Sequence, residues 1–511
     1  MIHTWARQGA WQILILQLLA GSSMVFAYAP FGEWYLVFPA LVFSSYFLND
    51  LKAKIALKHG FAFALGYFGA GMSWVHISMY QFGGTGAFLA TLFTLGFVAL
   101  LAVFPAIAYY LTRRYFNQFS AGLFWLIAWP FSWFLLEWIR SWIFTGLPWL
   151  NLGHSQFEGP LSGIMPILGA DGATVWVLLL VGLIQLTIQY RDRLASRLAI
   201  AWVINTVLIL GLFNLSWVKP SGESLSVTVV QPNVPQENKW VPAYRIKAME
   251  DLYSITEGDK NDLIIWPEAA IPALPSQIMD YLESIDALAE MQEQTILSGI
   301  PVQTDGRYYN AIQLYGTSSG EYHKRKLVPF GEYVPFEEQL RGLITFFDMP
   351  MSSFSKGDYN QPHLTIDGHQ VALAICYEII FSEMVAQQVE GSDYLVTLSN
   401  DAWFGDSHGP QQHLEIARIR ALEYGIPIIR GTNDGISAFI DAEGNLIKTL
   451  GKGIAGTMQH DLQLQTGMTP YRQIGPTWAL VILFIPFVIG LVLNRKAIRR
   501  MLRSNDTGSK E

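Results

Sequence analysis

Cysteine and charged residues are both scarce in this sequence. Cys376 is the only cysteine among 511 residues, so no intramolecular disulfide can form in any compartment. Only 14% of the residues are charged and the formal net charge is −8, with no block of lysine or arginine. We therefore expect no nucleic-acid partner. The sequence also lacks a cluster of metal ligands and a nucleotide-binding motif, so we expect neither a metal nor a cofactor.

Hydrophobic residues, by contrast, make up 51% of the chain, and the mean hydropathy is +0.28. This composition indicates a membrane protein. Several apolar runs approach the roughly 20 residues that a helix needs to cross a bilayer. They are Gln12–Ala29, Trp34–Leu48, Gly60–Tyr80, Ala87–Leu111, Ala121–Arg140, Ala173–Gln189, Leu198–Val218 and Pro476–Asn494. We predict that these runs form eight transmembrane helices.

Two features of these runs are open to more than one interpretation. The first run follows Arg7 and ends in Ala27-Tyr28-Ala29, which also resembles a signal peptide with its cleavage site. Its direct continuation into the second run favours a helical hairpin. Glu137, near the end of the fifth run, is either interfacial or a functional acid within the membrane. With His76, it is the residue that would support a transporter or channel.

Basic residues near the ends of the runs predict the orientation of the chain. Clusters occur before the first run, in alternate connections and after the last run, at Arg7, Lys52–Lys58, Arg113–Arg114, Arg191–Arg197 and Arg495–Arg503. The connections Ala29–Glu33 and Gln81–Gly86 contain no lysine or arginine. By the positive-inside rule the N-terminus is cytoplasmic and residues 219–473 lie outside the cytoplasm. We predict a seven-helix membrane domain over 1–218, an eighth helix over 474–494 and a cytoplasmic tail over 495–511.

The segment 219–473 has a different pattern. Short β-branched runs predict strands at Ser226–Val230, Leu263–Trp266, Thr295–Ser298, Ala311–Tyr315, Val371–Cys376, Tyr394–Leu398 and Ile426–Ile429. Helix-length stretches separate several of them, at Ala243–Thr256, Ile278–Gln294 and His413–Tyr424. This alternation predicts an α/β domain.

Reactive side chains follow three of these predicted elements. Glu268 comes directly after one strand, Cys376 ends another, and a lysine, either Lys324 or Lys326, follows a hairpin. A thiol needs a base to become a nucleophile, and the oxyanion that forms on its acyl partner needs a cation or N–H donors. Together these residues suit acyl transfer. Taken singly, each also fits a buried or solvated structural residue.

The motifs around these residues resemble the nitrilase, or carbon–nitrogen hydrolase, superfamily. They are Trp266-Pro267-Glu268, Lys324 before Pro329-Phe330-Gly331-Glu332, and Cys376-Tyr377-Glu378. With the apolar runs, the whole chain resembles the apolipoprotein N-acyltransferase family. The family spacing to Glu332 selects Lys324 over Lys326.

The resemblance implies an αββα sandwich and a role for each site residue. Glu268 would be the general base, Lys324 the oxyanion stabiliser and Cys376 the nucleophile. The supporting residues would be Glu332, Glu378, Tyr377 and Asn310, with Trp240 and Trp403 around the substrate. A phospholipid would donate an acyl chain to Cys376, and a diacylglyceryl-modified apolipoprotein would accept it as an amide.

We expect a monomer in the bacterial inner membrane with its catalytic domain on the periplasmic face. Ping-pong kinetics would follow from the thioester. The alternatives are a membrane-anchored amidase that uses the same three residues, and a transporter with a sensor domain. Seven helices exceed what an anchored amidase needs, since one would suffice.

The segment Leu343–Phe354 is rich in phenylalanine and methionine but contains Asp348 and Pro350. Ordinary core packing is one interpretation. The other is an apolar loop that meets the bilayer and admits lipid, with Phe346, Phe347 and Met349 contacting the substrate.

Overall fold

The structure of the protein is a computed structural model that describes residues 10–83, 86–333 and 354–494. The chain divides into two compact units. One consists of Met1–His76, Gly86–Leu215 and Ile474–Glu511, and the other of Ile77–Thr85 and Ser216–Gln473. We refer to them as the helical unit and the sheet unit.

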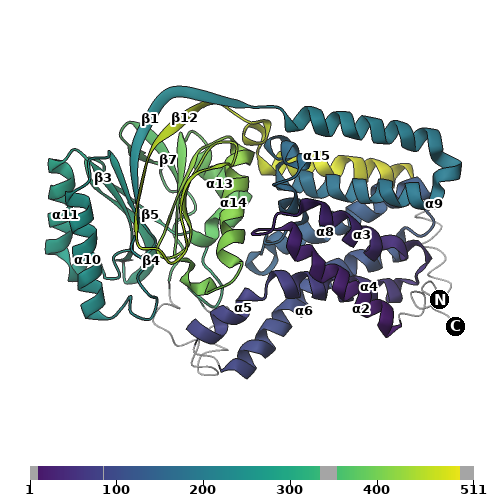
Figure 1. The fold of residues 1–511 in the computed structure, drawn as a ribbon, viewed down its shortest axis with the longest axis horizontal. Coiled ribbons are helices and arrows are strands. Elements are labelled where there is room, and N and C mark those ends of the chain that lie inside the picture. Colours follow the sequence, from purple (N-terminus) through teal and green to yellow (C-terminus); the bar gives the residue numbers. More distant parts are fainter. Residues whose placement is uncertain (1–9, 84–85, 334–353, 495–511) are drawn as a thin grey trace. The chain divides into compact units, whose positions relative to one another are not determined.

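Apolar helices build the helical unit (Figure 1). The longer ones are α2 (Trp11–Ser23), α3 (Val37–Tyr46), α4 (Ala53–Gly71), α6 (Ala87–Tyr115), α8 (Trp129–Trp142), α9 (Met165–Phe213) and α15 (Pro470–Leu493). Short helical turns join them: α5 (Trp74–Ile77), α7 (Ala121–Leu123), η1 (Met24–Ala27), η2 (Trp34–Leu36), η3 (Leu48–Asp50), η5 (Phe124–Ala128), η6 (Ile143–Thr145), η7 (Leu152–Gln156) and η8 (Pro160–Ile164). The backbone of α9 leaves helical geometry at Gly169 and Tyr190, so α9 consists of successive helical segments.

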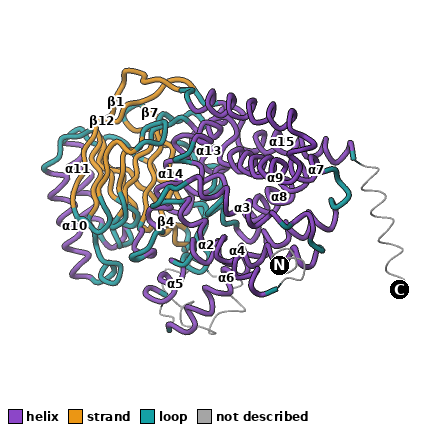
Figure 2. The backbone as a smooth tube through the Cα atoms, turned by 45° about the vertical axis from the view of Figure 1, so that its right-hand side comes forward, coloured by secondary structure: helices purple, strands orange, loops and turns teal. Residues whose placement is uncertain are grey.

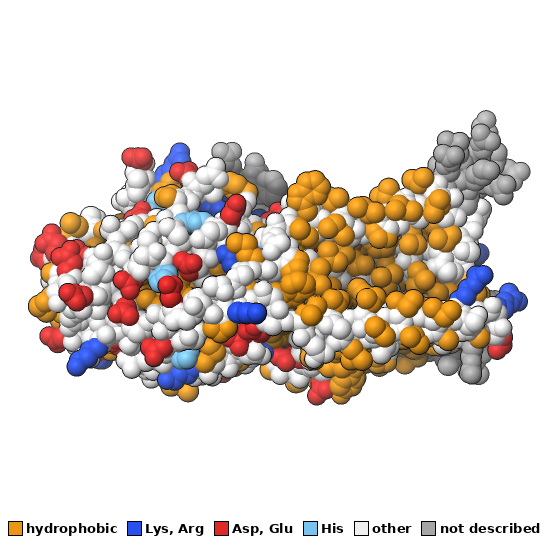
Figure 3. Space-filling model, turned by 90° about the horizontal axis from the view of Figure 1, so that it is seen from above, with side chains coloured by type: hydrophobic (Ala, Val, Ile, Leu, Met, Phe, Trp, Pro, Cys, Tyr) orange, Lys and Arg blue, Asp and Glu red, His pale blue; other side chains and the backbone are white. Residues whose placement is uncertain are grey.

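Among the described residues, five helices are long and apolar enough to cross a membrane. They span Ala87–Tyr115, Ala121–Thr145, Pro160–Tyr190, Asp192–Phe213 and Pro470–Leu493, and match the last five predicted runs. Large side chains on Asp192–Phe213, such as Val203 and Val207, are more than 60% exposed. Figure 3 shows hydrophobic side chains gathered into a continuous exposed surface, and such a surface is typical of contact with lipid.

The first three predicted runs differ in length from their helices. The first forms a short apolar helix over Trp11–Ala27, and the second contains the ten-residue α3. The run predicted over Gly60–Tyr80 is interrupted, because α4 starts earlier, at Ala53, and ends at Gly71. The residues that follow, in η4 (Ser78–Phe82), belong to the sheet unit.

Two glycines allow α2 and α4 to approach closely. A Cβ at Gly66 would lie 1.9 Å from the carbonyl oxygen of Leu18, and one at Gly21 would lie 1.8 Å from that of Phe63. Small residues at such crossings are typical of membrane helices. Gln17 of α2 also donates to the Ser44 carbonyl at 3.2 Å. These contacts fix α2 against α4 and α3 within the helical unit.

Glu137 of α8 is buried in the helical unit, where three groups donate hydrogen bonds to it. Its carboxylate accepts hydrogen bonds from the Thr174 hydroxyl at 2.8 Å, from Trp133 Nε1 at 3.2 Å and from the Leu152 amide at 3.2 Å. Arg140, one turn later, donates to the carbonyls of Leu147 and Trp149 at 2.7 and 2.8 Å. These contacts tie the segment after α8 to the helix.

The sheet unit is built from two six-stranded sheets, ordered β12-β1-β2-β3-β4-β5 and β11-β10-β9-β8-β7-β6 (Figure 2). The first sheet contains β1 (Val218–Gln231), β2 (Leu263–Trp266), β3 (Thr295–Thr304), β4 (Arg307–Gly316), β5 (Gly320–His323) and β12 (Gly456–Gly467). The second contains β6 (Leu364–Ile366), β7 (His369–Ile375), β8 (Tyr394–Ser399), β9 (Ile428–Thr432), β10 (Ser437–Ile440) and β11 (Leu446–Leu450). Pairing is parallel for β1–β2, β2–β3, β7–β8 and β8–β9, and antiparallel elsewhere.

The two sheets share one hydrophobic core. Alternate residues of β1, such as Val227 and Val229, point into it together with Leu373 of β7 and Val396 of β8. Helices α10 (Pro242–Glu257) and α11 (Met279–Met291) pack on the outer face of the first sheet, where Leu252 and Ile285 join a second core. Helices α13 (Ser382–Val389) and α14 (Gly409–Tyr424) lie beyond the second sheet (Figure 1). The layers therefore run αββα, as the resemblance implied.

Candidate active site

Cys376 stands at the point where β7 ends and the short helix η11 (Cys376–Ile380) begins. Its φ is +50°, in the left-handed region that a residue with a Cβ seldom adopts. Such a conformation costs of order 1–3 kcal/mol and persists only where surrounding contacts impose it. The sharp turn leaves the thiol half-buried at the end of the strand.

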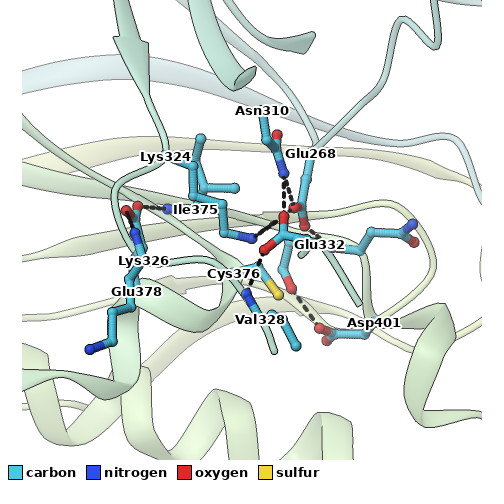
Figure 4. A network of polar contacts seen from close by, with 12 residues as sticks. Glu268, Asn310, Lys324, Lys326, Val328, Glu332, Ile375, Cys376, Glu378 and Asp401 are labelled. Carbon is cyan, nitrogen blue, oxygen red and sulfur yellow. Dashed lines mark hydrogen bonds and ion pairs between the residues drawn. The ribbon is translucent and has the colours of Figure 1, made fainter. Parts of the chain in front are cut away.

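Glu268 and Lys324 lie near this thiol although they come from the other sheet. Glu268 follows β2 and is 7% exposed, and Lys324 follows β5 and is 1% exposed. The Lys324 ammonium lies 3.4 Å from Glu268 Oε1 and 2.8 Å from Glu332 Oε1. Figure 4 shows the Cys376 sulfur beside this cluster. The structure thus brings together the three residues that follow predicted strands and hairpin.

Asn310 of β4 joins the two carboxylates. Its side-chain amide donates to Glu268 Oε1 at 2.7 Å and to Glu332 Oε1 at 3.0 Å. The second oxygen of Glu268 accepts a hydrogen bond from the backbone amide of Asn400 at 2.9 Å. The second oxygen of Glu332 accepts one from the backbone amide of Val328 at 2.8 Å. Buried carboxylates need such partners, and these contacts hold both in one geometry.

The electrostatics of the cluster keep the resting thiol protonated. Burial and the negative charge of Glu268 raise the pKa of Cys376 to about 12, although Lys324 opposes the rise. Burial alone would lower the pKa of Lys324, but the carboxylates of Glu332 and Glu268 outweigh it and raise that pKa. The lysine is therefore a cation at neutral pH. A thiol this weakly acidic must pass its proton to a base as it attacks.

Lys326, the alternative lysine, lies elsewhere. Its ammonium sits 4.4 Å from the ring centroid of Phe381. Its backbone amide donates to Glu378 Oε1 at 3.1 Å. Geometry therefore agrees with Lys324 as the lysine of the cluster.

Glu378 fastens the turn that carries Cys376. It accepts hydrogen bonds from the amides of Ile375 at 2.8 Å and Arg325 at 2.6 Å, and from the Tyr322 hydroxyl at 3.0 Å. It therefore joins the start of η11 to the segment after β5, which carries Lys324. In Figure 4 it lies apart from the thiol, so its contribution is to hold the two segments together.

The aromatic residues predicted around the substrate differ from one another in burial and in contacts. Tyr377 is half-buried, with its ring 4.9 Å from that of Phe381. Trp403, in η12 (Asp401–Phe404), contacts Phe82 of η4 with ring centroids 5.6 Å apart. Trp240 is 40% exposed. Phe346, Phe347 and Met349 lie outside the described residues.

Several residues near the cluster were missed from the sequence. Lys239, adjacent to Trp240, donates to the backbone carbonyl of Glu268 at 3.1 Å, and burial lowers its pKa to about 8. Gln236 accepts from the Asn400 side chain at 2.7 Å. Gln236 and Asn400 lie in the polar stretches Gln231–Gln236 and Ser399–Gly405. No spacing rule distinguished the contacting side chains from their neighbours.

A cavity of about 290 Å³ opens next to these residues. Its lining comes from η4, from the segment before α10, from η12 with the residues after it, and from the turn after β9. It includes Phe82, Gln236, Glu237, Gly405, Asp406 and Asp434. Gln236 connects it through Asn400 to Glu268. A cavity with both polar and apolar lining therefore lies within two hydrogen bonds of the glutamate.

The chain matches two family models, the apolipoprotein N-acyltransferase N-terminal domain over residues 20–183 and carbon–nitrogen hydrolase over residues 226–472. It is 41% identical to an apolipoprotein N-acyltransferase of Vibrio vulnificus, over 92% of this chain and 94% of that one. A Pseudomonas aeruginosa protein of the same name is 38% identical over 92% of this chain and 93% of its own. Since these likenesses span both units, the chain belongs to the apolipoprotein N-acyltransferase family.

Proposed function

We propose that the protein is an N-acyltransferase that moves a fatty acyl chain from a phospholipid, through a thioester on Cys376, to the N-terminal amine of a diacylglyceryl-modified apolipoprotein. The observation that carries this proposal is the convergence of Glu268, Lys324 and Cys376 in a chain whose relatives carry that name. A membrane-anchored amidase is not favoured, because the likeness to the acyltransferases extends through the helical unit.

In the first half-reaction, Glu268 takes the proton of the Cys376 thiol as the sulfur attacks the ester carbonyl. Negative charge moves to the carbonyl oxygen, and Lys324 stabilises it. When the intermediate collapses, the C–O bond breaks and the lysophospholipid alkoxide takes the proton from Glu268. The acyl chain remains on the sulfur as a thioester.

In the second half-reaction, the acceptor amine attacks the thioester carbonyl. Glu268 accepts the amine proton, the C–S bond breaks, and Glu268 returns that proton to the leaving Cys376 thiolate. An amide is more stable than the ester that supplied the acyl group, so the overall transfer needs no ATP. Asn310 and Glu332 hold Glu268 and Lys324 in place through both steps.

The lipid nature of both substrates explains a membrane location. The five long apolar helices support a bacterial membrane protein. We extend this to eight crossings, with the first three runs as shorter helices and the sheet unit on the periplasmic side of the inner membrane. The distribution of lysine and arginine supports that arrangement.

The half-reactions can be tested separately. The purified chain, incubated with phospholipid alone, should gain the mass of one fatty acyl group on Cys376 and release one lysophospholipid. Hydroxylamine should remove that mass, and Cys376→Ala should show neither product. Adding an apolipoprotein should then discharge the acyl group. An acyl-enzyme that only water discharges would indicate an amidase-type hydrolase instead.

A further inference from the structure

Behind Cys376 lies a buried group of charged residues that the proposed chemistry does not use. Asp401, at the start of η12, His413, of α14, and Arg430, of β9, are each at most 1% exposed as side chains. Arg430 Nη2 lies 2.7 Å from Asp401 Oδ2. The Ser399 hydroxyl donates to Asp401 Oδ1 at 2.6 Å. A buried ion pair is costly to desolvate, so its position next to a nucleophile calls for a reason.

His413 connects this group to the nucleophile. Its Nε2 lies 3.1 Å from the backbone carbonyl oxygen of Cys376. A carbonyl can only accept, so Nε2 carries the proton and donates it. Nδ1 lies 3.1 Å from Arg430 Nη2 and 3.3 Å from Asp401 Oδ1. With the proton on Nε2, Nδ1 accepts from Arg430, and Asp401 orients the ring by holding that guanidinium at 2.7 Å. Burial and the charge of Arg430 lower the pKa of His413, although Asp401 opposes the shift, so the ring is neutral at neutral pH.

The carbonyl that His413 holds belongs to the peptide between Cys376 and Tyr377. In a trans peptide the C=O and the N–H point in opposite directions, so fixing one fixes the other. This peptide directly follows the left-handed turn at Cys376, whose φ is +50°. A hydrogen bond on this carbonyl therefore anchors the turn that carries the thiol and fixes the direction of the Tyr377 amide.

We propose that His413, oriented by Asp401 and Arg430, is a positioning residue that holds the Cys376–Tyr377 peptide in the geometry needed for acylation. The inference rests on the proposed acyl transfer through Cys376. His413 neither touches the acyl group nor moves a proton. A side chain that donates a hydrogen bond from the place of Nε2 should therefore replace it.

The test compares three substitutions in the full-length chain in detergent. His413→Gln keeps an amide N–H near the position of Nε2, His413→Asn carries the same amide one bond too short, and His413→Leu has no donor. The rate of Cys376 acylation by phospholipid is measured by intact mass and normalised to folded protein. His460→Leu is the matched control, because His460 lies on β12 and stacks 5.2 Å from Phe439, away from the cluster.

We expect His413→Leu and His413→Asn to acylate roughly 100-fold more slowly, the scale of a misplaced reacting group. His413→Gln should stay within about tenfold of wild type and keep the same pH profile of acylation. The phospholipid concentration at half-maximal rate should be unchanged in all variants. His460→Leu should match the wild type.

Several outcomes would overturn the inference. The first is that His413→Leu is acylated at the same rate as the wild type, and the second is that the Gln and Asn variants lose acylation rate equally. The others are that His413→Gln has an altered pH profile of acylation, or that it does not fold. Loss of all acylation in the wild type would instead refute the proposed function. In that case the rate at which iodoacetamide alkylates Cys376 still reports its positioning, and the same ranking of variants is expected.

Discussion

Cys376 combines a strained backbone with a thiol that holds its proton tightly. The pKa of about 12 means that the thiolate is scarce at neutral pH, and its fraction rises tenfold for each pH unit until that value is approached. Part of this rise comes from Glu268, the group that is proposed to remove the proton. Removing its charge should therefore affect two reactions of the same sulfur in opposite ways.

Glu268→Gln should slow acylation by phospholipid by about 10²–10⁴, because the general base is lost. Alkylation by iodoacetamide at pH 8 should become faster, because the thiol pKa falls when the neighbouring negative charge is gone. Lys324→Met should slow both reactions, since it removes the cation that opposes the rise in the thiol pKa. Intact mass measured over time reports both. Normal acylation in Glu268→Gln would remove that residue from the base role.

Glu268 and Cys376 could be singled out because each follows a strand that its own sequence marks. The hairpin left Lys324 and Lys326 equivalent, and only the family spacing selected Lys324. The buried partners were harder to predict. Asp401, His413 and Arg430 come from a turn, a helix and a strand, and their meeting depends on how those elements pack. Local sequence carries no signal for that. Trp240 is a second example. It was predicted to lie around the substrate, but the residue that donates a hydrogen bond to the Glu268 backbone is its neighbour Lys239.

At the scale of elements, the Glu378 side chain links the start of η11 to β5 and to the segment that follows it. Glu378→Ala would leave the amides of Ile375, Arg325 and Lys326 without their acceptor. We expect a loss of about 3 kcal/mol or more in the free energy of unfolding, at about 1–3 kcal/mol for each buried unsatisfied group. Glu378→Gln, which keeps one acceptor oxygen, should lose less. Denaturant unfolding measures both.

The matched control for that experiment is Glu383→Ala, on the exposed side of α13. It should change the unfolding free energy by no more than about 0.5 kcal/mol. An equal loss in the two alanine variants would show that Glu378 does not join the segments.

The crossing of α2 and α4 gives a second test at this scale. Gly66→Ala should separate the helices and lower the thermal stability of the solubilised chain, because its Cβ would collide with the Leu18 backbone. Gly69→Ala, on the same helix, has only Val98 Cγ1 nearby at 3.9 Å. It should be neutral or stabilising by up to about 1 kcal/mol, since alanine favours the helix. Equal unfolding temperatures for the two variants would contradict the close crossing.

Elements with strong apolar patterns were predicted well. The structure has β2 at the predicted residues, and α10 and α11 differ from prediction by a few residues at their ends. The strand β12 was missed because it contains no run of β-branched residues, and His460 interrupts the alternation of its buried residues Met458, Leu462 and Leu464. The interruption of the third run was also missed, since its residues stay apolar after Gly71.

At the scale of the whole molecule, orientation in the membrane is the main prediction. Reporter fusions after Asp50, Arg114, Arg191 and Arg503 should all be cytoplasmic, and Cys376 should react with an impermeant thiol reagent from the periplasmic side. The charge distribution provides the reason, because lysine and arginine are retained on the cytoplasmic face. One periplasmic fusion among the four would break the eight-helix arrangement.

The strands β1 and β12 pair along their length, with Val218 opposite Gly467. One follows α9 and the other precedes α15 in the chain. Residues opposite each other in an antiparallel pair are about 5 Å apart, so the main stretch of the sheet unit leaves and rejoins the helices through neighbouring points. Adjoining ends are the condition under which one domain can be inserted into another. The carbon–nitrogen hydrolase fold is therefore an insertion in the connection between two helices, α9 and α15. The short segment Ile77–Thr85 is a second part of the sheet unit that comes from elsewhere in the chain.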